Sequence, residues 1–576
     1  MHVAISWQPE TYQFTPVWLV SIYVVSSLLI RQCLIPQIHR GGAISSLSLI
    51  SEQSSFFANI LTILKVCRTL QTTIDQSVGL LYQVQLEIEG LIDGPKGNLC
   101  TSDRLQLLLE RRDRWLRLDW TNIVTLAAAK LVPETPLPYE LQGGTFFNVT
   151  TYDGKFTMNM TRLPSIAGPR PTYESKNFDS QYVDITADPS QDLMVVLDVP
   201  GRLHVWSLST CEPHPLANKP VLREEGTPEA RMTGLSIAHD LVALVEWTGQ
   251  VSATIWNWKT GAMILHGHGH DLPHLVTGLA WLSPDKFVVS DADTNSLLLF
   301  SLSSYDCVSP ATPYTFATLF PYVRLQLPTI HDTWHLSFFQ LETTPLLASV
   351  PKDRPFIPSP EHNIVVFTLQ YATMDHTQVT GRYLGFVHAR HLMSHLSGRG
   401  PPPERLEDIK VVPWTEWGPQ NTRIMRNCFS RATYARYVHG QKVVYPSFRD
   451  TREDNRIQYI VVLDFNLHPK RLESIVGANG RLKETFDRRI KTELVREPEA
   501  LERRVADSSG LHMVPLPPFA EKVTTCLPYV KTVKMVDKRP EKRTSHFMMD
   551  DERVIELNHR ISQDDPNDAQ VRVYTF

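Results

Sequence analysis

Four histidines at nearly alternate positions are the residues in this chain whose types and spacing most suggest chemistry. They lie in the segment HGHGHDLPH, residues 266–274. Imidazole nitrogens are common ligands of zinc and other transition metals, so this spacing could hold a metal ion. The two glycines indicate a loop, and no Cys or Glu lies close by. The sequence therefore favours a solvated loop over a metal site.

Three other clusters have both a functional and a structural interpretation. Trp414 and Trp417 suit an aromatic recognition patch or packing in the core or at the rim of a blade, and we favour packing. Residues 531–543, KTVKMVDKRPEKR, carry six basic and two acidic residues, which suits a patch for acidic partners or a solvated loop; we favour the loop. Residues 548–552, MMDDE, predict a strand with packed methionines that ends in an acidic turn.

Motifs of known catalytic or nucleotide-binding function do not occur at a usable position. The patterns GxGxxG, GxxxxGK[ST], HExxH and GxSxG were considered, and no nucleophile is paired with a base. The sequence therefore predicts a protein that is not an enzyme, with no cofactor and no bound metal. Residues far apart in sequence can still meet in a folded chain, so an enzyme stays as the third and weakest alternative.

Composition excludes several classes of protein and indicates a compartment. Of 576 residues, 42% are hydrophobic, which excludes wholesale disorder. The 57 Lys and Arg against 61 Asp and Glu give a net charge of −4, so no basic excess drives nucleic-acid binding. The seven cysteines are widely spaced and include no CxxC. Unpaired thiols predict a reducing compartment, the cytoplasm or the nucleus.

The elements that must position any site are predicted from a repeat. Residues 185–210, 235–261 and 279–304 share one plan, in which polar turns separate three apolar strands. The third strands end at Trp206, Trp256 and Phe300, so the repeats are about 50 and 44 residues long. A repeat of this length with three or four strands predicts a mainly β fold, a WD40-like β-propeller of six or seven irregular blades. Blades cover one another's faces, and we expect Trp206 and Trp256 in the core.

Less regular strands and long insertions follow. Candidate strands occupy residues 334–341, 363–371, 383–388, 409–414, 442–445, 458–465, 531–536, 554–557 and 571–576. Residues 397–407 and 470–514 are expected to be surface loops, the second with a helix at 472–495. A hairpin is predicted over residues 144–160, with Asp153 and Gly154 at its turn. Because an open ring would expose two edges, we predict that this hairpin and residues 571–576 close the ring.

The region before the propeller is predicted to be helical. Apolar residues recur at helical spacing after residue 56, a second helix is expected at 78–88, and a third at 103–118 with Ser102 as its N-cap. The predicted domains are therefore an N-terminal segment (1–55), a helical region with a linker helix (56–138) and the propeller (139–576).

Residues 14–30 contain no charge, and Asn148 and Asn159 lie in N-x-T sequons. These features suit a membrane-anchored or secreted propeller. The stretch is shorter than the ~20 apolar residues that a membrane-spanning helix needs, it contains Pro16, and no basic residues precede it. We favour a short buried helix, and a membrane partner is not expected.

The chain resembles the F-box proteins of mushroom-forming (basidiomycete) fungi from about residue 57 to its end. The resemblance lies in LKVCRTLQTTIDQSVGLLYQVQLEIEGLIDGP (64–95), SDRLQLLLERRDRWLRLDWT (102–121), YELQGGTFF (139–147), ADPSQDLMVVLDV (187–199), LSTCEPHPLA (208–217) and IWNWKTG (255–261). It implies that an F-box binds the Skp-type adaptor of a cullin ubiquitin ligase and that the β-rich part binds a target protein. The implied adaptor-binding residues are Leu61, Leu64, Val66, Cys67, Leu70 and Ile74.

The front half of the F-box is missing from this chain. The Leu-Pro-x-Glu helix that opens an F-box is absent, and a hydrophobic stretch and a Ser-rich stretch take its place. Either the gene model includes a wrong exon, or the gene has lost this half. The resemblance therefore implies an F-box-like substrate receptor. A propeller scaffold without ubiquitin ligase coupling and a membrane-anchored propeller stay as alternatives.

Overall fold

The chain divides into two compact units, Met1–Thr62 and Ile63–Phe576, and this computed structural model describes residues of the second unit only. The described part is residues 76–576 with gaps, of which the longest are 128–138, 224–232, 427–435, 477–488, 502–517 and 560–569. The hydrophobic stretch 14–30 and the first predicted helix therefore lie outside the described residues.

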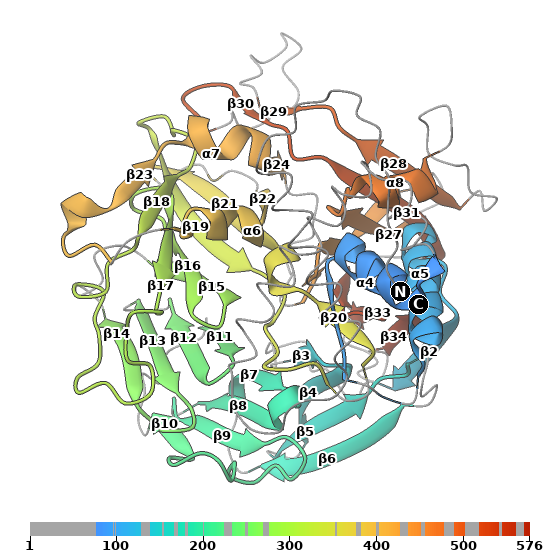
Figure 1. The fold of residues 1–576 in the computed structure, drawn as a ribbon, viewed down its shortest axis with the longest axis horizontal. Coiled ribbons are helices and arrows are strands. Elements are labelled where there is room, and N and C mark those ends of the chain that lie inside the picture. The colour runs from blue at the N-terminus through green and yellow to red at the C-terminus, as the bar shows by residue number, and fades with distance from the viewer. Residues whose placement is uncertain are drawn as a thin grey trace, which may run out of the picture. The chain divides into compact units, whose positions relative to one another are not determined.

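Seven sheets of four or five strands follow one another through the described residues and form a β-propeller (Figure 1). The predicted fold class is confirmed, with seven blades. The first three blades are β3 (Tyr139–Gln142), β4 (Thr145–Tyr152), β5 (Lys155–Arg162) and β6 (Thr172–Phe178); β7 (Tyr182–Asp188), β8 (Leu193–Asp198), β9 (Leu203–Ser207) and β10 (Val221–Arg223); and β11 (Thr233–Ala238), β12 (Leu241–Glu246), β13 (Ser252–Asn257) and β14 (Met263–His268).

The next three blades include the insertions. They are β15 (Val276–Ser283), β16 (Lys286–Asp291), β17 (Ser296–Ser301), β18 (Val323–Gln326) and β23 (Lys410–Val412); β19 (Trp334–Glu342), β21 (Ile364–Thr373), β22 (Tyr383–His388) and β24 (Thr422–Arg426); and β25 (Val438–His439), β26 (Lys442–Asp450), β27 (Asn455–Asp464), β31 (Tyr529–Pro540) and β28 (Ile490–Val495). Each candidate strand predicted between residues 334 and 576 overlaps an observed strand.

The seventh blade closes the ring with strands from the two ends of the described chain. It consists of β2 (Asn122–Ala127), β34 (Gln570–Thr575), β33 (Arg553–His559) and β32 (Thr544–Met549). β2 and β34 are antiparallel, with Val124 opposite Val573. The predicted closure between residues 144–160 and 571–576 is wrong, because β4 and β5 belong to blade 1. The closing sheet also includes a strand before residue 139, where we expected the propeller to begin.

The predicted repeats form the first three strands of blades 2, 3 and 4, and they share one turn. The carbonyls of Asp192, Asp240 and Asp285 follow the first strand, and each accepts a hydrogen bond over 2.7–3.0 Å from a residue after the third strand. In blade 3 that residue is Trp258, which is fully buried. Trp256 is buried as predicted, whereas Trp206 is only partly buried.

Middle strands of a blade are covered on both faces, which explains their composition. All six residues of β8, β12 and β17 are buried. A strand with two buried faces needs apolar residues at nearly every position rather than at alternate positions. The runs LMVVLD, LVALVE and SLLLFS meet this need.

Two helices precede the closing strand. α4 spans Val78–Glu89 and α5 spans Thr101–Arg117, so both predicted helices in the described region are confirmed. The predicted N-cap is wrong, because α5 begins one residue before Ser102 and Cys100 occupies the N-cap position. Between the helices, β1 (Leu91–Asp93) pairs with β20 (Phe356–Pro358), a strand from the long connection between β19 and β21.

The insertions in blades 5 and 6 add small elements around the ring. They comprise α6 (Ala389–Ser394), α7 (Trp414–Asn421), α8 (Pro469–Ile475), the pair β29 (Glu499–Leu501) and β30 (Val523–Thr525), and the 3-10 turns η3 (Pro360–His362) and η4 (Leu406–Asp408). A further 3-10 turn, η1 (Pro189–Gln191), joins β7 and β8 in blade 2. The helix predicted for residues 472–495 is wrong over its last part. α8 ends at Ile475, and residues 490–495 form β28, which pairs with β31.

Candidate functional site

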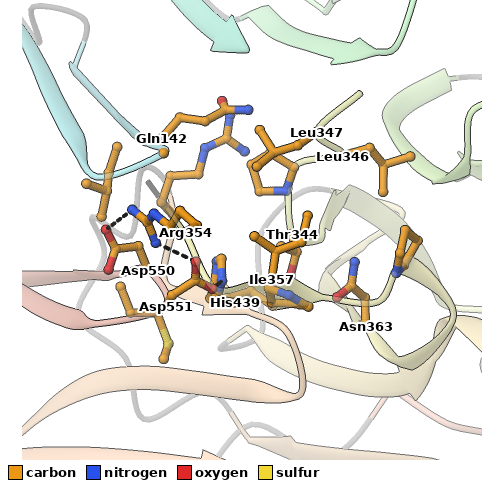
Figure 2. Close-up of a pocket in the computed structure, with 18 of the residues that line it drawn as sticks. Gln142, Thr344, Leu346, Leu347, Arg354, Ile357, Asn363, His439, Asp550 and Asp551 are labelled. Atoms are coloured by element: carbon orange, nitrogen blue, oxygen red, sulfur yellow. Dashed lines mark hydrogen bonds and ion pairs between the residues drawn. The ribbon is translucent and has the colours of Figure 1, made fainter. Parts of the chain in front are cut away.

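A pocket with apolar walls and a charged cluster lies where the first strands of several blades end. Its lining comes from the β3–β4 turn, the connection after β19, the start of β25 and the turn after β32 (Figure 2). The inner strands of blades 1 to 5 lie next to one another around the ring, so this end of the ring brings residues distant in sequence together. The β1–β20 pair adds Ile92, Ile357 and Pro358 to the same pocket.

Glycines form the β3–β4 turn because both of its positions need a positive φ. Gly143 has φ +57° and Gly144 has φ +80°, the backbone of a two-residue turn in a hairpin. A Cβ on Gly144 would lie 2.6 Å from the Arg354 Nη2 atom. Gly144 therefore allows both the turn and the approach of Arg354.

Asp551 is the centre of the charged cluster in this pocket. Its carboxylate accepts a hydrogen bond from Arg354 Nη1 over 2.5 Å and lies 2.5 Å from His439 Nε2. Arg111 of α5 lies 3.7 Å from the same carboxylate, and Trp115 Nε1 donates to the Asp551 carbonyl over 3.1 Å. One residue of blade 7 thus contacts blade 6, the β20 connection and α5.

The neighbouring Asp550 is held by a second arginine. Arg553 Nη1 lies 2.7 Å from Asp550 Oδ2, and Arg553 Nε donates to the Pro164 carbonyl. Burial alone would raise the pKa of each aspartate. The opposing charges, Arg553 and Arg354 at Asp550 and chiefly His439 and Arg354 at Asp551, hold both pKa values below the usual range. Both carboxylates therefore stay ionised and do not act as general acids near neutral pH.

A second buried cluster attaches α4 to blade 6. Arg471 lies 2.7 Å from Asp464 Oδ2 and 3.2 Å from Glu89 Oε1, where α4 ends. Asn466 Nδ2 donates to the Ile88 carbonyl over 2.9 Å. Burial opposes the charge of Asp464, but Arg471 and Lys442 lower its pKa. The two helices are thus fixed to the propeller by buried ion pairs at both clusters.

A third group of charges lies on the inner strands. Arg436 makes two contacts with Glu140, at 2.5 and 2.6 Å. Burial raises the pKa of Asp184 to about 7 and that of Glu342 to about 7, with Glu140 adding to both shifts and Arg436 opposing them. Three carboxylates therefore share one guanidinium, and two of them titrate near neutral pH.

The size and lining of the pocket limit what it can hold. The cavity has a volume of about 60 Å³, which is room for a few water molecules at roughly 10–15 Å³ each. Apolar walls from Leu141, Leu346, Leu347, Ile357 and Val438 surround the charged groups. A nucleotide-sized cofactor does not fit in this space. Among the described residues, the pocket lining contains no Ser, Cys or Lys, and its one hydroxyl group, on Thr344, accepts a hydrogen bond from the Gly440 N–H over 2.7 Å.

The sequence-predicted site residues and this pocket do not coincide. The adaptor-binding residues Leu61, Leu64, Val66, Cys67, Leu70 and Ile74 lie outside the described residues. The sequence reasoning missed Arg111, Arg354 and His439. The one available signal was the acidic turn after residues 548–549, which the structure confirms: Met548 and Met549 are buried in β32 and packed, and Asp550 and Asp551 follow.

The other clusters of the sequence analysis are structural where they are described. Trp414 and Trp417 are buried, their ring centroids lie 5.2 Å apart, and Trp417 Nε1 donates to the Gln326 carbonyl, so the packing interpretation is confirmed. Residues 263–268 form strand β14, so a loop is wrong for the first histidines. The basic run is strand β31 up to residue 540, not a solvated loop.

Three observations bear on metals, membranes and disulfides. Within the described residues, no group of three or more His, Cys, Asp or Glu side chains is arranged to hold a metal ion. No described helix is long and apolar enough to cross a membrane. Asn148 of the first sequon is 6% exposed in β4, so the folded chain shields it, and the four described cysteines are unpaired.

Comparisons with known proteins find structural similarity only. No protein-family model and no curated protein matches the chain. Three similar solved structures are the WD40 domain of Toxoplasma gondii coronin (10% identity, 75% of this chain and 92% of that chain, TM-score 0.31), the C-terminal WD40 domain of Sif2 (9%, 79% and 98%, TM-score 0.30) and the β-propeller domain of Myceliophteria thermophila Cps50 (Swd1) (8%, 79% and 100%, TM-score 0.35).

Proposed function

We propose that this chain is a non-catalytic protein-interaction protein, in which the propeller binds a target and the N-terminal helices serve a second partner. The observation that carries this proposal is the attachment of α4 and α5 to the propeller through Asp551 and Arg471. Buried ion pairs of this kind hold two elements in one orientation, and breaking one is strongly unfavourable. A target on the ring and a partner at the helices would then be kept in a fixed arrangement.

The chemistry of the described pocket supports a role in binding rather than catalysis. Its carboxylates are paired with Arg354, Arg553 and His439, and the lowered pKa values of Asp550 and Asp551 keep both ionised, so neither carboxylate serves as a proton donor near neutral pH. The pocket also lies beneath the β1–β20 pair. We infer that it joins parts of the protein and does not process a ligand.

The opposite end of the ring offers a surface for the target. The connections between second and third strands lie there, because strands in a blade alternate in direction. Three described residues on these connections are exposed and apolar: Val199 at 36%, Met374 at 62% and Val379 at 52%. Loops on a rigid scaffold often carry binding residues, and Met374 and Val379 lie on the same connection, between β21 and β22. Met374→Glu should weaken target binding, whereas Leu216→Glu, on the pocket side of blade 2, should not.

The finer proposal is coupling to a cullin ubiquitin ligase, as the resemblance to fungal F-box proteins implies. The adaptor-binding residues would be Leu61, Leu64, Val66, Cys67, Leu70 and Ile74. What supports it is chain connectivity: Ile74 precedes α4 by three residues, and α4 is fixed to blade 6. We propose that the protein works in the cytoplasm or the nucleus, where the unpaired cysteines stay reduced.

A pull-down of the full chain with a fungal Skp-type adaptor tests this coupling. We expect retention that is lost in a Leu64→Asp, Leu70→Asp double variant. The matched control is Val78→Asp, since Val78 is 45% exposed at the start of α4. No retention of the unchanged chain would refute adaptor coupling and leave the scaffold without ubiquitin. Transcript sequencing across residues 1–56 decides whether a Leu-Pro-x-Glu exon belongs upstream.

A further inference from the structure

The closing strand β2 lies at the outer edge of blade 7, and one of its sides has no partner strand among the described residues. The strand order of blade 7 is β2, β34, β33 and β32, so β2 is outermost and pairs with β34 on one side. No strand of the described residues pairs with its other side. An edge strand presents backbone N–H and C=O groups that can pair with another extended chain.

β2 differs from the other outermost strands in how this edge is protected. Charged residues and covering segments are the usual protection of a sheet edge. The outermost strands β6, β10, β23, β24 and β28 each contain at least one Lys, Arg, Asp or Glu. β14 contains none, but Tyr314 covers it through backbone hydrogen bonds with Ile264 and His266. Among the described outermost strands, β2 (NIVTLA) alone is both uncharged and uncovered.

The side chains of β2 are also suited to strand pairing. Ile123 is 49% exposed, and Thr121 and Thr125 on the same face are exposed as well. β-branched residues stabilise cross-strand pairs on such a face. The six residues extend over roughly 20 Å at about 3.4 Å per residue, which is enough for a short peptide strand.

We propose that the outer edge of β2 binds an extended, uncharged segment of a protein partner by strand addition. Its backbone would supply the missing hydrogen bonds, and β-branched or apolar side chains would lie opposite Ile123. This inference rests on the proposed role in protein interaction, but it concerns a different surface from the adaptor-binding residues and from Met374. A second copy of this chain is the less suitable occupant. A stable dimer buries about 1,200–2,000 Å² in total, far more than one six-residue strand supplies.

Hydrogen–deuterium exchange of the full chain tests the proposal. The probe is an eight-residue peptide of alternating threonine and valine with blocked ends, and the control peptide has proline in place of each valine. We expect the first peptide to slow exchange in residues 121–127 and the proline peptide to have no effect. In the Ile123→Lys variant the peptide concentration needed for half protection should rise at least tenfold. In Tyr173→Lys, on the already charged edge of β6, it should not change.

Several results would overturn the proposal. They are no protection of residues 121–127 at the highest soluble peptide concentration, equal protection in Ile123→Lys, or protection at β6 instead. A doubled mass in light scattering without peptide, lost in Ile123→Lys, would assign the edge to a second copy. If Ile123→Lys does not fold, Thr125→Lys replaces it. None of these results affects the adaptor pull-down, so the two proposals fail separately.

Discussion

Arg354 Nη1 donates a hydrogen bond to Asp551 Oδ2 over 2.5 Å, although the two residues lie 197 positions apart in the chain. Both side chains are buried, at 6% and 7% exposure. Arg354 lies just before β20, and Asp551 lies in the turn after β32. The contact therefore connects the segment before β20, which lines the pocket, to the turn after β32 in blade 7. Arg111 and Trp115 bring α5 to the same turn.

Removing the charge of Asp551 should destabilise the protein. In Asp551→Asn, Arg354 loses its buried ion pair and His439 loses its partner, and such losses are worth about 3–5 kcal/mol. The free energy of unfolding from urea titration measures the effect. The matched control is Glu407→Gln, because the Arg405–Glu407 pair is 75% and 71% exposed. That control should change stability by less than about 1 kcal/mol. Similar values for both variants would contradict the role of Asp551.

Gly144→Ala should destabilise the same junction through the backbone. Gly144 has φ +80°, where an alanine is strained by roughly 1–2 kcal/mol, and the new Cβ would displace Arg354. Gly79 in α4 is the control, since a Cβ there meets nothing within 4 Å. Gly79→Ala should stabilise the helix by about 0.5–1 kcal/mol. The midpoint of thermal unfolding should therefore fall in Gly144→Ala and rise in Gly79→Ala. A shift in the same direction for both variants would contradict the turn geometry.

Leu126→Ala tests the closure of the ring by β2. Leu126 is 3% exposed and packs in a cluster with Val571 and Val573 of β34. The loss of this side chain should lower the free energy of unfolding by about 2–5 kcal/mol. Thr125→Ala, at the exposed neighbouring position, should change it by less than about 0.5 kcal/mol. A neutral Leu126→Ala would mean that β2 does not close the seventh blade in solution.

Asp184 and Glu342 should make stability fall as the pH rises towards neutrality. Each has a pKa of about 7 in the folded chain, raised by burial from the usual 3.8 and 4.5. Between about pH 4 and pH 7 the folded state holds protons that the unfolded state has released, so the free energy of unfolding decreases with pH. Above about pH 7 both states are ionised, and this contribution stays constant.

The double variant Asp184→Asn, Glu342→Gln isolates this contribution. Glu140 and Arg436 remain in place, while the two titrating groups are gone. The free energy of unfolding of the variant should increase relative to that of the unchanged chain as the pH rises from 4 to 7. Urea titration at each pH measures this difference. Glu212→Gln, a 70% exposed carboxylate, is the control. An unchanged difference across this range would show that the pair does not titrate there.

The blades could be predicted where local pattern determines structure. β8, β12 and β16 each pair with the next strand along the chain, and strands that pair with sequence neighbours leave a pattern of apolar runs separated by polar turns. The closure could not be predicted in this way. β2 pairs with a strand more than 440 positions away, and nothing in the sequence NIVTLA specifies that partner. Pairing at such distance depends on the geometry of the whole ring.

The candidate site could be predicted from the sequence only in part, because it too depends on contacts between residues far apart in the chain. Asp550 and Asp551 were expected in an acidic turn, since strand and turn are local features. Their partners Arg111 and Arg354 come from α5 and from the β19–β21 connection, whose sequences resemble ordinary solvated surface. The loop expected at residues 531–543 is wrong up to residue 540, because β31 pairs with β27 and β28, and one of its charges, Lys534, is buried and donates a hydrogen bond to the Leu118 carbonyl.

The pairing of β2 with β34 has a consequence for the synthesis of the protein. β2 leaves the ribosome early, and its partner is made more than 440 residues later. At roughly 5–20 residues per second, translation leaves β2 unpaired for about 20 to 90 seconds. During that interval both edges of an uncharged strand are open to neighbouring nascent chains. Aggregation during synthesis is therefore avoided only if these six residues are protected from other nascent chains or if translation is completed quickly.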